Sequence, residues 1–94
     1  MELFFKSVAN LTSNEELRIL ALLYEREADS IFKSISRKKI QDGLSFKEAS
    51  LRKCLLLLQG KQFIQSNHHT KEIKYFISEF GIQALTYSLE RTGV

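Results

Sequence analysis

Residues 45–64 read SFKEASLRKCLLLLQGKQFI, and the rest of the chain is organised around this stretch. Ser45 and Glu48 have the spacing of a capping box, in which the serine accepts from the backbone N–H of the glutamate and the glutamate carboxylate reaches back to the serine. The pattern that follows predicts a helix over about 46–59. Gly60 then offers a left-handed cap that ends this helix.

The predicted helix has two different faces. Leu51, Leu55 and Leu58 recur at the i, i+4, i+7 spacing that lines one face of a helix, so we expect them in the core. The other side carries Phe46, Ala49, Ser50 and Lys53. We interpret that side as a surface presented to a partner, and the DNA major groove is our first hypothesis for that partner.

A chain of 94 residues, 44% of them hydrophobic, is expected to form one domain over 1–94 with a core of three or four helices. It has no apolar run long enough to cross a bilayer, and its apolar start at Leu3, Phe4 and Phe5 lacks the features of a secretory signal. We therefore expect a soluble, cytoplasmic protein. The single cysteine, Cys54, fits a reducing compartment, because it cannot form an internal disulfide.

Positive charge is concentrated in the middle of the chain. Residues 33–74 carry a formal charge of +7, whereas residues 1–32 carry −3 and residues 75–94 carry −1. Scattered charge on a solvated surface is the alternative explanation. Because the cations fall in the segment that also holds the presented helix, we favour a polyanionic partner.

The segment before this basic region predicts one long helix. Ser13 and Glu16 form a second capping box, and the apolar residues that follow at helical spacing predict a helix over about 13–28. Its outer face is acidic, so we expect it to lie away from any phosphate backbone. Ile31 and Phe32 then form a short apolar pair, interpreted as a minor strand or a turn packed beneath the core.

A short helix is predicted over about 36–42, with Ser34 or Ser36 as its N-cap. Gly43 then supplies a positive φ that ends this helix before the next one begins. A helix, a glycine-containing turn and a second helix form the unit in which the second helix lies in the DNA major groove.

Two strands and a last helix complete the pattern. Residues 63–77 predict a β-hairpin, with a polar tip at about 67–71. Ser78 can cap a final helix over about 79–91. We expect a mainly α fold with a small β-hairpin.

This order of elements resembles a winged helix-turn-helix domain over nearly the whole chain. The residues that carry the resemblance are 51–55 with Leu58, 62–64 and 77–81. They are similar to the recognition helix, the entry to the first wing strand, and the step from wing to last helix in small bacterial regulators of the multiple-antibiotic-resistance and phenolic-acid-repressor kind. Gln62 stands where glycine is common in that family, and Ser78 stands where threonine is common.

A more distant resemblance, through residues 34–40 and 78–85, is to the centromere-binding adaptor of tubulin-type plasmid partition. Both resemblances imply a protein that binds double-stranded DNA as a homodimer, as a transcriptional regulator or a DNA-organising factor. Half-sites about one helical turn apart would then be expected.

The resemblance implies three groups of DNA contacts, which differ in what they read. Side chains on the recognition helix would reach base edges and phosphates, whereas those on the preceding helix and the wing would contact the backbone. The implied contacts are Arg37, Lys38 and Lys39 on the short helix, Lys47, Ser50, Arg52 and Lys53 on the recognition helix, and His68, His69, Lys71 and Lys74 on the wing.

Other residues leave alternatives open. Leu56 and Leu57 fall towards the presented side of the helix, so either another segment covers them or this surface, with Phe46, binds a protein partner instead of DNA. Five apolar residues are also expected to contact a second subunit or another partner, although they could equally belong to the core. This set consists of Leu3, Phe4, Phe5, Leu85 and Leu89.

No enzyme activity, cofactor or metal is expected. The sequence has no nucleophile elbow, glycine-rich phosphate loop or paired metal ligands. His68 and His69 lie on a predicted loop without a nearby ligand set, so we interpret them as solvated wing residues. Cys54 is interpreted as a small apolar side chain, with redox sensing as the alternative.

Overall fold

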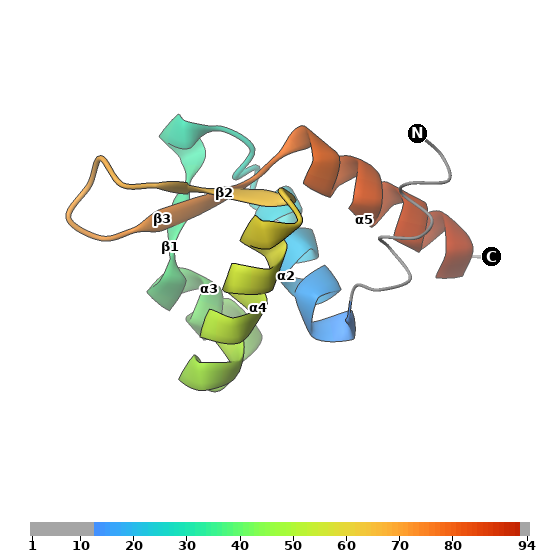
Figure 1. Cartoon of the computed structure of the whole chain (residues 1–94), viewed down its shortest axis with the longest axis horizontal. Coiled ribbons are helices and arrows are strands. Elements are labelled where there is room, and N and C mark those ends of the chain that lie inside the picture. Colours follow the sequence, from blue (N-terminus) through green and yellow to red (C-terminus); the bar gives the residue numbers. More distant parts are fainter. Residues whose placement is uncertain (1–12, 93–94) are drawn as a thin grey trace.

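The computed structural model describes residues 13–92, and the side chains of residues 13–89. Within these residues, helices pack on one side of a small antiparallel sheet whose hairpin projects from one end of the molecule (Figure 1). The elements are α2 (Asn14–Glu25), the 3₁₀ turn η1 (Ile31–Lys33), β1 (Ile35–Ser36), α3 (Arg37–Leu44), α4 (Glu48–Gly60), β2 (Ile64–Asn67), β3 (Lys74–Ile77) and α5 (Glu79–Thr92).

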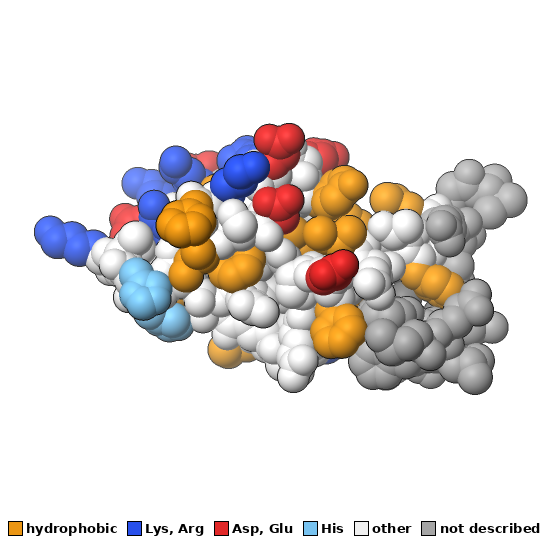
Figure 2. Space-filling view, turned by 90° about the horizontal axis from the view of Figure 1, so that it is seen from above, with side chains coloured by type: hydrophobic (Ala, Val, Ile, Leu, Met, Phe, Trp, Pro, Cys, Tyr) orange, Lys and Arg blue, Asp and Glu red, His pale blue; other side chains and the backbone are white. Residues whose placement is uncertain are grey.

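The sheet has the order β1-β3-β2, and both pairings are antiparallel. The β2-β3 hairpin is the one expected from the sequence, and it projects at the end where Lys and Arg side chains gather when the molecule is seen from above (Figure 2). The third strand, β1, was not predicted. It consists of two residues, Ile35 and Ser36, which is too short a segment to show a period-2 pattern.

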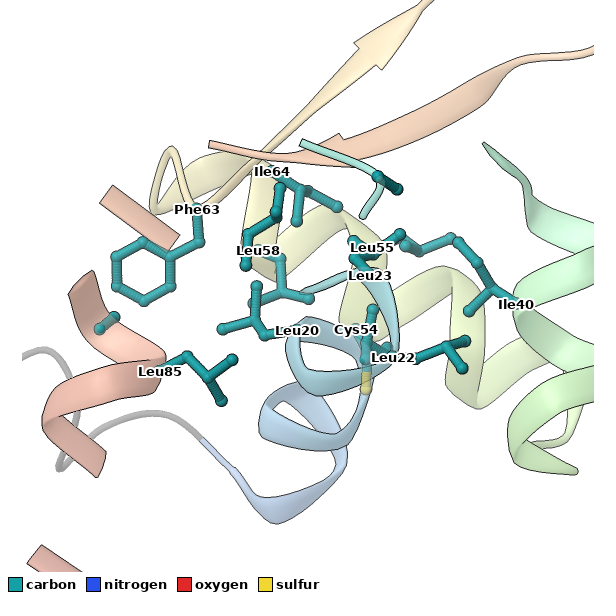
Figure 3. Close-up of a cluster of buried hydrophobic side chains, with 14 of the residues drawn as sticks. Leu20, Leu22, Leu23, Ile40, Cys54, Leu55, Leu58, Phe63, Ile64 and Leu85 are labelled. Atoms are coloured by element: carbon teal, nitrogen blue, oxygen red, sulfur yellow. The ribbon is translucent and has the colours of Figure 1, made fainter. Parts of the chain in front are cut away.

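The core forms where α2, α4, α5 and the base of the hairpin converge (Figure 3). Leu51, Leu55 and Leu58 of α4 are at most 2% exposed, which confirms their predicted burial. Phe63 and Leu20 lie in the same cluster and are completely buried. Burial of apolar side chains on this scale contributes about 25 cal/mol per Å² and is the main stabilising term of the fold.

The capping box predicted at the start of α2 is present. The backbone N–H of Glu16 donates to the Ser13 hydroxyl, and the Glu16 carboxylate accepts from the backbone N–H of Ser13, both at 3.2 Å. The same carboxylate is buried and lies 2.8 Å from the Nζ of Lys61. This ion pair ties the start of α2 to the residue that caps the end of α4.

The capping box predicted at Ser45 is wrong. Helix α4 begins at Glu48, and its N-cap, Lys47, makes no side-chain cap hydrogen bond. Ser45 instead caps the end of α3 in the left-handed conformation, with φ at 57°, and its backbone N–H donates to the Gln41 carbonyl. The serine therefore completes the preceding helix, and the positive φ expected at Gly43 falls on Ser45.

Gly43 lies inside α3 and serves close packing. A Cβ atom added there would lie 3.0 Å from the Nη2 atom of Arg26 and 3.3 Å from a Leu22 methyl group. The missing side chain thus lets α3 approach α2. Gly60 likewise stays helical as the last residue of α4, and the left-handed residue is Gln62, with φ at 63°.

The step from the hairpin to α5 follows the prediction. The Ser78 hydroxyl accepts from the backbone N–H of Gly81 at 3.1 Å, which confirms the expected cap, and donates to the Gln62 carbonyl at 2.6 Å. A Cβ atom at Gly81 would overlap the carbonyl oxygen of Phe63. A glycine is therefore needed where α5 crosses the start of β2.

The Ile31–Phe32 pair does not pack beneath the core. These residues form the turn η1, and Phe32 is 96% exposed. Polar contacts hold the turn at the surface, because the side-chain amide of Asn67 donates to the Ile31 carbonyl and to the Ser34 hydroxyl. Helix α2 also ends earlier than the predicted residue 28, since Glu27 adopts a left-handed conformation. None of the helices in the described part of the chain could cross a membrane.

Candidate nucleic-acid interface

The candidate interface consists of α3, the first turns of α4 and the β2-β3 hairpin. Of the implied DNA contacts, two are half-buried, namely Arg37 and Lys74. The others are exposed, and they are Lys38, Lys39, Lys47, Ser50, Arg52, Lys53, His68, His69 and Lys71. On the face seen in Figure 2, Lys and Arg side chains gather towards the hairpin end, and Asp and Glu side chains lie both among them and closer to the middle of the molecule.

Helical phase explains why these cations face outward. Ile40 is completely buried and fixes the rotation of α3, and the Ser36 hydroxyl caps this helix by accepting from the backbone N–H of Lys39 at 3.3 Å. Lys38 and Lys39 are then left on the solvent side. The buried leucines of α4 impose the same constraint on that helix, which turns Ser50 and Lys53 outward.

Glu48 links two of the predicted contacts and was not itself predicted as a site residue. Its Oε1 atom accepts a hydrogen bond from Arg52 of α4 at 3.1 Å and forms an ion pair with Arg37 of α3, whose Nη2 atom lies 3.3 Å away. The i, i+4 spacing of Glu48 and Arg52 is a sequence signal for the second pair. The first pair joins different helices, so no local pattern could indicate it.

A groove runs between the start of α3, the start of α4 and the hairpin. Its lining includes the side chains of Arg37, Lys38, Glu48, Ile73 and Tyr75. Cationic, anionic and apolar groups thus meet in one concave surface. Such a surface can contact phosphates and base edges at the same time.

The hairpin tip is held by its own polar side chains. Asn67 is buried and its amide oxygen accepts from the backbone N–H of His69 at 3.0 Å. The Ser66 hydroxyl lies 2.8 Å from Nε2 of His68, and the Thr70 hydroxyl donates to the Glu72 carbonyl. Among the described residues, no three His, Cys, Asp or Glu side chains are grouped as metal ligands would be.

The second half of α4 exposes two leucines. Leu56 is 69% exposed and Leu57 is 44% exposed, so the wing does not bury either of them. Phe46 is partly buried, and the guanidinium carbon of Arg18 lies 4.9 Å from the centre of its ring. The alternative partner surface predicted from these three residues is thus open at the two leucines.

The residues expected at a dimer interface differ in their exposure. Leu85 belongs to the core, whereas Leu89 is 59% exposed and borders a groove between α2 and α5. Leu3, Phe4 and Phe5 lie outside the described residues.

Cys54 faces the core from α4. It is buried, and its Sγ atom lies 3.7 Å from a carboxylate oxygen of Glu15. Burial raises the pKa of the Cys54 thiol, and the nearby negative charge of Glu15 raises it further. The thiol therefore remains protonated near neutral pH, which supports the interpretation as a small apolar side chain over a reactive one.

Helices α2, α3 and α4, the hairpin and the final α5 define a winged helix-turn-helix protein, in which α4 is the recognition helix and the hairpin is the wing. Its fold is similar to that of MepR of S. aureus, solved as a complex with DNA, with a TM-score of 0.70 at 17% identity over 86% of this chain and 57% of that one.

The chain belongs to the TubR family. It is 33% identical, over 86 residues, to the DNA-binding protein TubR of Priestia megaterium, a match that covers 92% of this chain and 85% of that protein. The structure of TubR from Bacillus megaterium pBM400 has a TM-score of 0.86 at 32% identity, over 92% of this chain and 96% of that one. No family model matches the sequence.

Proposed function

We propose that this protein binds double-stranded DNA through the surface formed by α3, the first turns of α4 and the wing. The observation that carries the proposal is the exposure of Lys38, Lys39 and Lys53 on a helix-turn-helix, in a chain whose family relative is named a DNA-binding protein. The recognition helix enters the major groove, so that Ser50 and Lys53 approach base edges. Lys38 and Lys39 contact phosphates, and the wing reaches the neighbouring backbone.

The protein acts as a homodimer in this proposal. Leu89 is exposed beside a mainly apolar groove that is lined by Leu17, Ala21 and Leu85 and also by Arg18, and this groove offers a contact surface for a second subunit outside the proposed DNA surface. A second subunit doubles the number of phosphate contacts and presents two recognition helices to half-sites about one turn apart.

The biological role is that of a DNA-binding regulator or DNA-organising factor in the cytoplasm, without enzyme activity. Two roles follow from the two resemblances, transcriptional regulation and plasmid partition. We favour partition because residues 34–40 and 78–85 resemble the partition adaptor, whereas the match to MepR, at 17% identity, reports the fold alone.

Fluorescence anisotropy with a labelled duplex of random sequence tests DNA binding. We expect an apparent affinity that falls steeply with salt, because each neutralised phosphate adds about one to the slope of log K against log salt. The triple variant Lys38→Gln, Lys39→Gln, Lys53→Gln should bind at least about tenfold more weakly at low salt and have a smaller slope.

The matched control is the double variant Arg26→Gln, Lys33→Gln, compared with the double variant Lys38→Gln, Lys53→Gln, because it removes the same charge at exposed positions outside both the proposed DNA surface and the α2-α5 groove. It should retain most of the affinity and the slope. Equal losses in both variants would mean that net charge, and not this surface, determines binding, and the proposed interface would be wrong.

A protein-interaction adaptor is the second candidate function. It is favoured by the exposure of Leu56 and Leu57 on the recognition helix, where a DNA-reading surface has little use for apolar side chains. Absence of duplex binding at low salt, in a folded wild-type protein, would support the adaptor over the DNA-binding protein.

A further inference from the structure

Glu48 places a carboxylate at the centre of the surface that we propose for DNA. It is the first residue of α4, and its side chain is 56% exposed. A carboxylate near phosphates is repelled, by about 1 kcal/mol at 4 Å even in water. Glu48 therefore weakens binding to the DNA phosphates unless its carboxylate makes a favourable contact with another part of the DNA.

The geometry of Glu48 leaves one carboxylate oxygen available. The Nη2 atoms of both Arg37 and Arg52 pair with Oε1, at 3.3 and 3.1 Å. Oε2 accepts no hydrogen bond from any residue that the structure describes. Two guanidinium groups from different helices pair with Oε1, so Oε2 is the carboxylate oxygen that remains for a ligand.

The neighbouring cations also reduce the cost of bringing this carboxylate to DNA. Arg37 and Arg52 together carry two positive charges beside one negative charge, so the cluster as a whole attracts phosphates. Glu48 remains able to accept a hydrogen bond within a locally positive surface.

We propose that Glu48 reads a base edge, by accepting a hydrogen bond from the exocyclic amine of a cytosine in the major groove. Residues in the first turn of the second helix of a helix-turn-helix are those that reach base edges. Cytosine presents an N4 donor there, whereas guanine and thymine present acceptors that repel a carboxylate, and adenine places an N7 acceptor beside its donor. This inference rests on the proposed DNA-binding function.

Selection from randomised duplexes with the wild-type protein and with the variants Glu48→Gln and Glu48→Ala tests the proposal. The wild type should select cytosine at one position, and replacing that cytosine should weaken binding about tenfold. Glu48→Gln should change the preference at that position to adenine, because an amide pairs with N6 and N7 of adenine. Glu48→Ala should lose the preference there and keep it at all other positions.

Glu25→Gln is the control, because it removes the same charge at an exposed position of α2 outside this groove and should leave the cytosine preference unchanged. Thermal unfolding checks that each variant is folded. If Glu48→Gln and Glu48→Ala bind every duplex more tightly with unchanged preference, Glu48 is only a counter-charge and the inference is overturned, while the proposed function stands. If the wild type binds no duplex at low salt, the proposed function itself fails.

Discussion

Single residues decide how closely α5 approaches the rest of the molecule. A Cβ atom at Gly81 would overlap the Phe63 carbonyl oxygen and lie 2.7 Å from a side-chain carbon of Ile77. The Ser78 hydroxyl lies at the same junction, where it donates a hydrogen bond to the Gln62 carbonyl and accepts one from the backbone N–H of Gly81. Gln62 is the residue with positive φ just before this crossing, which explains why the similar regulators commonly have glycine there.

Replacing Gly81 by alanine should therefore destabilise the protein by about 3 kcal/mol, because two backbone segments must move apart to admit the methyl group. Urea unfolding followed by circular dichroism measures this change. Gly60→Ala is the matched control, since a Cβ atom there meets nothing within 4 Å, and it should be neutral or stabilising by up to about 1 kcal/mol. Similar effects at both positions would contradict the packing argument.

At the scale of elements, the position of the recognition helix depends on its contacts with α2. The leucines of α4 pack into the shared core, and the ion pair between the buried Glu16 carboxylate and the partly exposed Lys61 joins the start of α2 to the end of α4. Removing one partner of a buried pair leaves an uncompensated charge, which costs more than the pair contributes when intact.

Lys61→Met is expected to lower the free energy of unfolding by about 3 kcal/mol, because the Glu16 carboxylate then stays buried and, among the described residues, keeps the Ser13 hydrogen bonds without a cation. The double variant with Glu16→Gln should recover part of this loss, as a double-mutant cycle in urea can show. Arg52→Met breaks an exposed pair and serves as the control, with an expected change below about 1 kcal/mol. If the double variant lost as much free energy of unfolding as the two single variants added together, Glu16 and Lys61 would not be coupled.

At the scale of the whole molecule, the cationic surface and the apolar α2-α5 groove are separate regions. The first includes α3, the start of α4 and the wing, whereas Leu89 borders the second. In the proposed dimer, this separation leaves both recognition helices free for DNA.

We expect Leu89→Arg to shift the proposed dimer towards monomer, raising its dissociation constant at least about tenfold, because a charge would be buried at an apolar contact. Sedimentation velocity over a concentration series measures the shift. Leu56→Arg, at a leucine on α4 that is even more exposed, should leave the oligomeric state unchanged if the α2-α5 groove forms the dimer contact. A wild-type protein that remains monomeric at all concentrations would exclude this dimer.

Much of the candidate surface could be predicted because charge and helical phase are local properties. Lys38, Lys39 and Lys53 are exposed as the periodicity of their helices requires. The pairing of Arg37 with Glu48 could not be predicted, since it depends on how α3 packs beside α4.

The sequence by itself determined the order of the elements, the leucine face of α4 and the caps at Ser13 and Ser78, because each depends on residues within a few positions of one another. The tertiary structure alone decided that β1 joins the sheet, that Ser45 and Gln62 take the left-handed conformations, and that Gly43 and Gly81 serve close packing. The physical reason is that these features arise where distant segments cross, and the space and hydrogen-bond partners available there are set by the neighbouring segment.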